Sequence, residues 1–180
     1  MSNREKKTTE VLDTAIKVPG FDKPGLILLV ARPGMGKTTF ALNLARTVAK
    51  NRTVAVFSLE MSREQLSAGF FSSAELMEND RIYIDDTPAP SVADIYAKCR
   101  RLDNLGLVVI DYLQLMGYSK TQRRDQGARQ QVIAEVSQKL NIIAKELKTP
   151  MLCLSQLSRT LESQESSALA QMADAVPFLQ

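Results

Sequence analysis

Short apolar runs alternate along the chain with segments in which apolar residues recur every three or four positions. Continuous apolar runs at 26–31, 53–59, 107–110 and 151–154 are typical of strands buried on both faces, and 82–84 predicts a shorter strand. The helical spacing predicts helices over 38–50, 62–78, 91–102 and about 132–147. A further strand over 173–179 is a weaker expectation because it contains Pro177.

This alternation predicts an α/β fold with a mostly parallel central sheet and helices on both faces. Two helix starts carry a capping-box signature, Ser62 with Gln65 and Ser91 with Asp94. Residues 1–20 are expected to form an amino-terminal arm or linker, and residues 21–180 one domain. In sheets of this kind ligands bind beyond the carboxyl ends of the strands, so the residues that follow each strand are the candidates for function.

Composition excludes several chemistries. The 180 residues include 23 Lys and Arg, 20 Asp and Glu and no His, which leaves a net charge of +3. Without His, the chain has no imidazole to act as a catalytic base or to bind a metal ion. Cys99 and Cys153 are expected to be reduced, buried thiols. No apolar run could span a membrane, and the polar amino terminus lacks a signal peptide, which predicts a cytoplasmic protein without a membrane partner.

A phosphate-binding loop is predicted directly after the first strand. Gly34 and Gly36 let backbone N–H groups turn toward phosphate oxygens, and Lys37 supplies a positive charge. The Thr38 hydroxyl is suited to bind Mg²⁺. A glycine turn without function is the alternative, but the position between a buried strand and a helix favours nucleotide binding. The predicted nucleotide-binding residues are Ala31, Arg32, Pro33, Gly34, Met35, Gly36, Lys37, Thr38 and Thr39.

Three more strands end in polar residues. Asp111 ends a run of aliphatic residues, as in a Walker B aspartate that holds Mg²⁺, although an acid there also caps helices. Glu60 follows the second strand and could activate the attacking water, provided that its strand neighbours the loop strand, or it could be a surface glutamate. Gln156 follows the fourth strand as a candidate γ-phosphate sensor or a solvated loop residue.

Five ordered segments together resemble the DnaB-type replicative DNA helicases. They are residues 30–38 (VARPGMGKT), 57–62 (FSLEMS), 84–88 (IDDTP), 109–115 (VIDYLQL) and 154–159 (LSQLSR). The resemblance covers most of the chain and implies the RecA-like P-loop motor domain, which acts as a hexameric ring. It implies that ATP and Mg²⁺ bind between subunits while single-stranded DNA passes through the centre. Lys37, Glu60 and Gln156 would be catalytic, and Thr38 and Asp111 would hold the metal. A helicase loader and a primase are possible partners.

The sequence also departs from that family. The amino-terminal collar domain is not represented, the stretches near 75–76 and 163–164 are shorter, and Gln180 precedes the family's arginine finger. We therefore expect weak hydrolysis from the isolated chain.

A basic stretch lies between the third strand and the long helix. It contains Lys120, Arg123, Arg124 and Arg129, which the resemblance places at a loop facing the ring channel, where they could bind DNA phosphates. A solvated charged loop is the alternative. Two other functions stay open at this point: a RecA-like ring ATPase that does not move DNA, as in KaiC-like or recombinase-like proteins, and a self-associating nucleotide-binding module without turnover.

Overall fold

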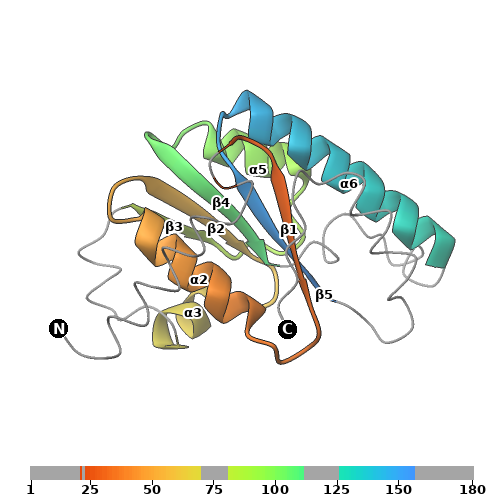
Figure 1. The fold of residues 1–180 in the computed structure, drawn as a ribbon, viewed down its shortest axis with the longest axis horizontal. Coiled ribbons are helices and arrows are strands. Elements are labelled where there is room, and N and C mark those ends of the chain that lie inside the picture. Colours follow the sequence, from red (N-terminus) through yellow and green to blue (C-terminus); the bar gives the residue numbers. More distant parts are fainter. Residues whose placement is uncertain (1–20, 22, 70–80, 112–125, 157–180) are drawn as a thin grey trace.

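The computed structural model describes residues 21, 23–69, 81–111 and 126–156. The strands are β1 (Leu26–Ala31), β2 (Thr53–Ser58), β3 (Ile82–Asp85), β4 (Leu105–Asp111) and β5 (Met151–Gln156). The helices are α2 (Lys37–Val48), α3 (Arg63–Gly69), α5 (Val92–Cys99) and α6 (Gln126–Glu146) (Figure 1). Each overlaps a range that the apolar pattern predicts. However, α6 begins at Gln126, before the predicted start near 132, so the end of the expected polar stretch is helical. The expected strand over 173–179 falls outside the described residues.

The described strands form one parallel sheet in the order β1-β5-β4-β2-β3. Because all strands run the same way, their carboxyl ends share one edge. There Ala31 pairs with Gln156, Ser58 with Asp111, and Phe57 with Asp85. The order places β5 and β4 between β1 and β2, so the condition attached to the Glu60 hypothesis, that its strand neighbours the loop strand, is not met.

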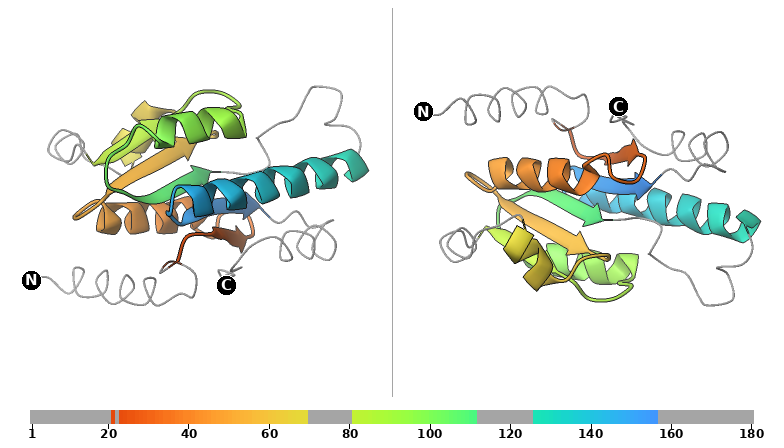
Figure 2. Two further views of the ribbon diagram at one scale, coloured as in Figure 1. Left: turned by 90° about the horizontal axis from the view of Figure 1, so that it is seen from above. Right: turned by 90° about the horizontal axis from the view of Figure 1, so that it is seen from below.

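Alternate residues of each strand enter two separate cores. Leu26, Leu28 and Val30 pack with α5 and α6, while Ile27 and Leu29 pack with α2 and α3. Figure 2 shows α2 and α5 on opposite sides of the sheet. The α/β fold with helices on both faces is therefore confirmed, and the double burial explains why the strands are apolar at nearly every position.

Local signals in the sequence set the helix ends. Gln65 accepts a hydrogen bond from the Ser62 N–H at 2.9 Å, and Ser91 and Asp94 form the second predicted capping box. Lys148 adopts a φ of 52° just beyond the end of α6, before Pro150.

Cys99 and Cys153 are buried and form no disulfide, as expected. Burial raises the pKa of the Cys99 thiol to about 12, which keeps it protonated and unreactive. None of the described helices contains an apolar segment that could cross a membrane.

Candidate functional site

The loop between β1 and α2 has the backbone that phosphate binding requires. Gly34 and Gly36 adopt φ of 78° and 79°, and a Cβ at either position would meet no atom within 4 Å. The left-handed conformation, not crowding, therefore selects glycine here. Gly36 is also the N-cap of α2 and provides no side-chain cap. The first N–H groups of α2 are thus available to an anion, with the positive end of the helix dipole behind them.

Lys37 lies across this loop and is half-buried. Its Nζ donates to the carbonyl oxygens of Ala31 and Arg32, both at 3.2 Å. Burial lowers the pKa of Lys37, and the negative charges of Asp111 and Glu60 counteract part of that effect. The ammonium group is therefore placed at the loop by hydrogen bonds to two neutral carbonyl oxygens, which charged phosphate oxygens can replace with stronger ones.

Thr38 and Asp111 come from different elements and meet at the strand edge. The Thr38 Oγ1 donates to Asp111 Oδ2 at 2.8 Å, although the residues are 73 positions apart. Asp111 is only 5% exposed, and burial raises its pKa, an effect that the Thr38 hydrogen bond and Lys37 reduce. A hydroxyl and a buried carboxylate are the hard oxygen donors that Mg²⁺ prefers. The donor set therefore fits Mg²⁺, with phosphate and water oxygens as its other ligands.

The described residues contain no cluster of three or more Cys, Asp or Glu side chains that could hold a metal by themselves. Mg²⁺ does not require such a cluster, because it usually binds through one or two carboxylates and keeps several waters.

Glu60 lies in the turn after β2 with its side chain exposed. Although β2 is not the neighbour of β1, the charge of Glu60 acts on both Lys37 and Asp111. The reason is that β2 pairs with β4, so the turn begins beside Asp111, whose carbonyl oxygen accepts the Leu59 N–H at 2.7 Å. The structure thus brings Glu60 to the same site as Lys37, Thr38 and Asp111.

The remaining predicted residues are placed only in part. Gln156 is the last residue of β5 and pairs with Ala31, which puts its backbone beside the loop. Arg129 belongs to α6, and its side chain lies outside the described residues. Lys120, Arg123 and Arg124 lie outside them altogether.

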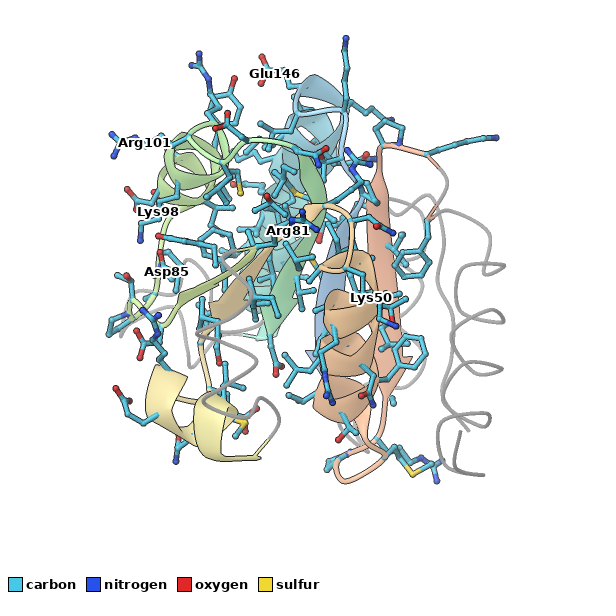
Figure 3. The ribbon with its side chains drawn as sticks, turned by 90° about the vertical axis from the view of Figure 1, so that its left-hand side faces the viewer. Lys50, Arg81, Asp85, Lys98, Arg101 and Glu146 are labelled. Carbon is cyan, nitrogen blue, oxygen red and sulfur yellow. The ribbon has the colours of Figure 1, made fainter. Side chains whose placement is uncertain are left out.

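Sequence reasoning missed a polar cluster at the outer end of the same edge. Asp85 ends β3, is 7% exposed and forms an ion pair with Lys98 of α5 (Figure 3). Burial by itself raises the pKa of Asp85, but hydrogen bonds from Lys98 and Thr87 outweigh it and hold the pKa at about 2. The sequence signal for this pair is an acidic residue at the end of a strand, Asp85, followed by a lysine on the next helix, Lys98.

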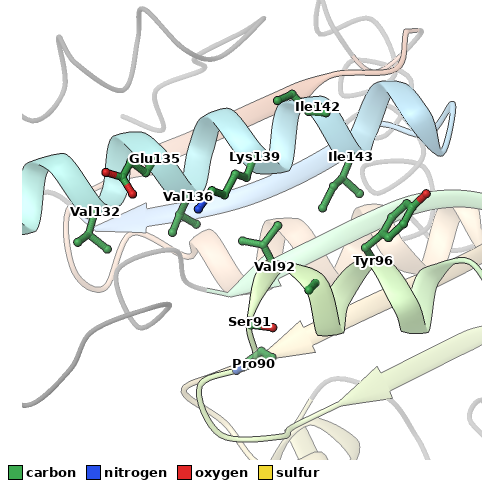
Figure 4. A pocket seen from close by; sticks show the side chains of 11 residues that line it. Pro90, Ser91, Val92, Tyr96, Val132, Glu135, Val136, Lys139, Ile142 and Ile143 are labelled. Carbon is green, nitrogen blue, oxygen red and sulfur yellow. The ribbon is translucent and has the colours of Figure 1, made fainter.

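A groove between α5 and α6 lies apart from this site. Val92 and Tyr96 of α5 face Val136 and Ile143 of α6 across it (Figure 4). None of its lining residues belongs to the loop, to Glu60 or to a strand end. The groove is therefore not the nucleotide site.

Comparisons with known proteins agree with this geometry. The sequence profile of the DnaB-like helicase C-terminal domain matches residues 7–78 and 69–180. The chain belongs to this family. It is 41% identical over 201 residues to the replicative DNA helicase DnaB of Geobacillus stearothermophilus, an alignment that covers 89% of this chain and 44% of that protein. The chain therefore spans less than half the length of this relative.

Solved structures of related proteins share the fold. One of them, an ATPase domain, has a TM-score of 0.69 at 26% identity, with 99% of this chain and 83% of that chain covered. A DnaB-like replicative helicase, described together with its interactions with primase, has a TM-score of 0.69 at 30% identity, with 86% of this chain and 46% of that chain covered. The RecA-like fold expected from the sequence is therefore confirmed.

Proposed function

We propose that this chain is the motor domain of a replicative DNA helicase, which couples ATP hydrolysis to movement along single-stranded DNA. One observation carries the proposal: Thr38 and Asp111 meet beside Lys37, at a strand edge where the charge of Glu60 also acts. A phosphate loop, a metal-binding oxygen pair and a carboxylate are the groups that phosphoryl transfer to water requires.

Each group has a separate role in this proposal. Residues 31–39 bind the phosphates through backbone N–H groups, and Lys37 compensates their charge. Thr38 and Asp111 hold Mg²⁺, which when bound neutralises charge on the phosphate oxygens. Glu60 accepts a proton from the attacking water, because it is the carboxylate that the turn after β2 brings to the site. Gln156 responds to the γ-phosphate at the end of β5.

Partners follow from the family and from the basic stretch. Lys120, Arg123, Arg124 and Arg129 bind DNA phosphates without reading the sequence, since their positive charges are attracted to the backbone of any single strand. The subunits assemble as a hexameric ring in the cytoplasm, with ATP between neighbours. A helicase loader and a primase act on this ring; one related helicase is described together with its interactions with primase.

ATP hydrolysis, measured with and without single-stranded DNA and beside the native mass, tests this function. We expect hydrolysis to increase with DNA and with protein concentration, because the active site lies between subunits. Hydrolysis at the same rate with and without single-stranded DNA would favour the KaiC-like or recombinase-like alternative. Tight ATP binding with self-association and no detectable hydrolysis in the presence of DNA, in place of the weak hydrolysis expected of this chain, would instead favour the nucleotide-binding module.

A further inference from the structure

We propose that Asp86 is a positioning residue for ATP hydrolysis: it holds the first turn of α3 and thereby fixes the turn that carries Glu60. The Asp85–Lys98 ion pair in turn fixes the loop from which Asp86 reaches α3. This inference rests on the proposed function, because it takes Glu60 as the group that accepts the proton.

The turn that carries Glu60 is anchored on the side of the sheet. The Leu59 N–H donates to the Asp111 carbonyl oxygen at 2.7 Å. The Ser58 Oγ donates to the Met61 carbonyl oxygen, also at 2.7 Å, and Ser58 is buried at the end of β2. These contacts fix both the start of the turn and its distance from the metal-binding aspartate.

On the helix side, the anchor comes from a different element. The N–H of Arg63, the first residue of α3, donates to Asp86 Oδ2 at 2.9 Å. Asp86 lies 23 residues further along the chain, in the loop after β3. A carboxylate is a strong acceptor for an N–H group in the first helical turn, because the helix dipole adds to the hydrogen bond. Asp86 therefore joins the start of α3 to the β3 end of the strand edge.

The loop that carries Asp86 is held on both sides of this residue. Before it, Asp85 Oδ2 forms the ion pair with Lys98 and accepts the Tyr83 hydroxyl at 3.2 Å. After it, the Thr87 N–H donates to Asp85 Oδ1 at 2.9 Å, and Lys98 Nζ donates to Thr87 Oγ1 at 3.1 Å. Figure 3 shows Asp85 and Lys98 at the α5 side of the sheet. The backbone of Asp86 is thus fixed on both sides, so the hydrogen bond from the Arg63 N–H to its side chain holds the start of α3 in place.

The hydrogen bond between Arg63 and Asp86 affects the rate because a catalytic carboxylate must be held within a fraction of an ångström of its position. A displacement of about 1 Å typically costs about a hundredfold in rate. Without Asp86, α3 keeps its own capping box and the packing of Leu66, but its first turn loses the hydrogen bond that joins it to the β3 end of the strand edge. We therefore expect Asp86→Ala to lower the hydrolysis rate by about ten- to a hundredfold. Mg²⁺–ATP affinity should not change, because no contact of Asp86 within the described residues reaches the phosphate loop.

Three variants of the chain test the inference. Asp86→Ala removes the acceptor, and Asp86→Asn retains an oxygen for the Arg63 N–H. Asp94→Ala is the matched control, because Asp94 accepts the Ser91 N–H at 2.9 Å at the start of α5, a helix that does not adjoin the Glu60 turn. The measurements are single-turnover hydrolysis of bound ATP, Mg²⁺–ATP affinity and hydrogen exchange of the Arg63 amide.

We expect a slower hydrolysis step and faster Arg63 exchange only in Asp86→Ala, with near-parental values in Asp86→Asn. In a Glu60→Gln background, Asp86→Ala should cause no further loss, because the group that it positions is already gone. Parental hydrolysis in Asp86→Ala, or an equal loss in both backgrounds, would overturn the inference and leave the proposed function intact. Parental hydrolysis in Glu60→Gln alone would overturn both.

Discussion

The Asp85–Lys98 pair gives the sharpest quantitative prediction about stability. Hydrogen bonds and the ion pair hold the pKa of Asp85 at about 2, against an ordinary value of 3.8. Since one pKa unit corresponds to about 1.4 kcal/mol, the ionised carboxylate adds roughly 2 kcal/mol to the free energy of unfolding at neutral pH. Asp85→Asn removes the charge but keeps an oxygen for Thr87, so it isolates this contribution.

The sign of the pH dependence follows from the depressed pKa. The contribution is fully present above the unfolded pKa of 3.8 and is lost as the pH falls through the folded pKa of about 2. At pH 7 we expect Asp85→Asn to be about 2 kcal/mol less stable, which corresponds to a melting temperature lower by roughly 4–8 °C. At about pH 3 the difference should shrink to about half, because the unfolded parent chain binds a proton there and the folded one does not.

Urea unfolding of both proteins at several pH values from neutral down to about pH 3 measures this difference. The matched control is Asp103→Asn, because Asp103 is exposed and forms no ion pair with a lysine within the part of the chain that the structure describes. A difference between parent and Asp85→Asn that stays constant with pH would refute the reasoning, since it would assign the loss to packing rather than to the ionised pair.

Three further variants test the nucleotide and DNA contacts. Lys37→Ala should weaken Mg²⁺–ATP binding by at least about tenfold in titration calorimetry, because a charge-assisted phosphate contact is lost; unchanged affinity contradicts the loop assignment. Gly36→Ala should lower stability by about 1–2 kcal/mol through left-handed strain and also weaken nucleotide binding, whereas thermal unfolding at the parent temperature would contradict the strain. Arg123→Glu with Arg124→Glu should weaken single-stranded DNA binding for every sequence and flatten its salt dependence, with ATP affinity unchanged; a parental salt slope would show that the stretch is only solvated.

The apolar pattern was sufficient to predict the strands and helices and to place the helices on both faces of the sheet. Strands buried on both faces must be apolar throughout, so the run at 26–31 identifies β1 with its observed bounds. The loop and Asp111 follow from the same logic, because every parallel strand ends at one edge. Local rules also sufficed at the helix starts, where Ser62 and Ser91 cap α3 and α5 as expected.

Strand order and long-range contacts could not be predicted in this way. The pattern of each strand is equally compatible with several neighbours, so it did not show that β5 and β4 separate β1 from β2. It did not pair Asp85 with Lys98 or Asp86 with Arg63 either, because these contacts depend on how the β3 loop meets α3 and α5. Glu60 reaches the site through its neighbour β4, which only the sheet order reveals.

A comparison of the parent chain with Glu60→Gln tests the central claim most directly, that this strand edge binds Mg²⁺–ATP and hydrolyses it with Glu60 as the base. Mg²⁺–ATP affinity and single-turnover hydrolysis are measured on both proteins, with single-stranded DNA present. The glutamine keeps the size of the side chain but cannot accept the proton from water. The account predicts parental affinity and hydrolysis slower by about two to four powers of ten. Hydrolysis at the parental rate in Glu60→Gln would contradict it.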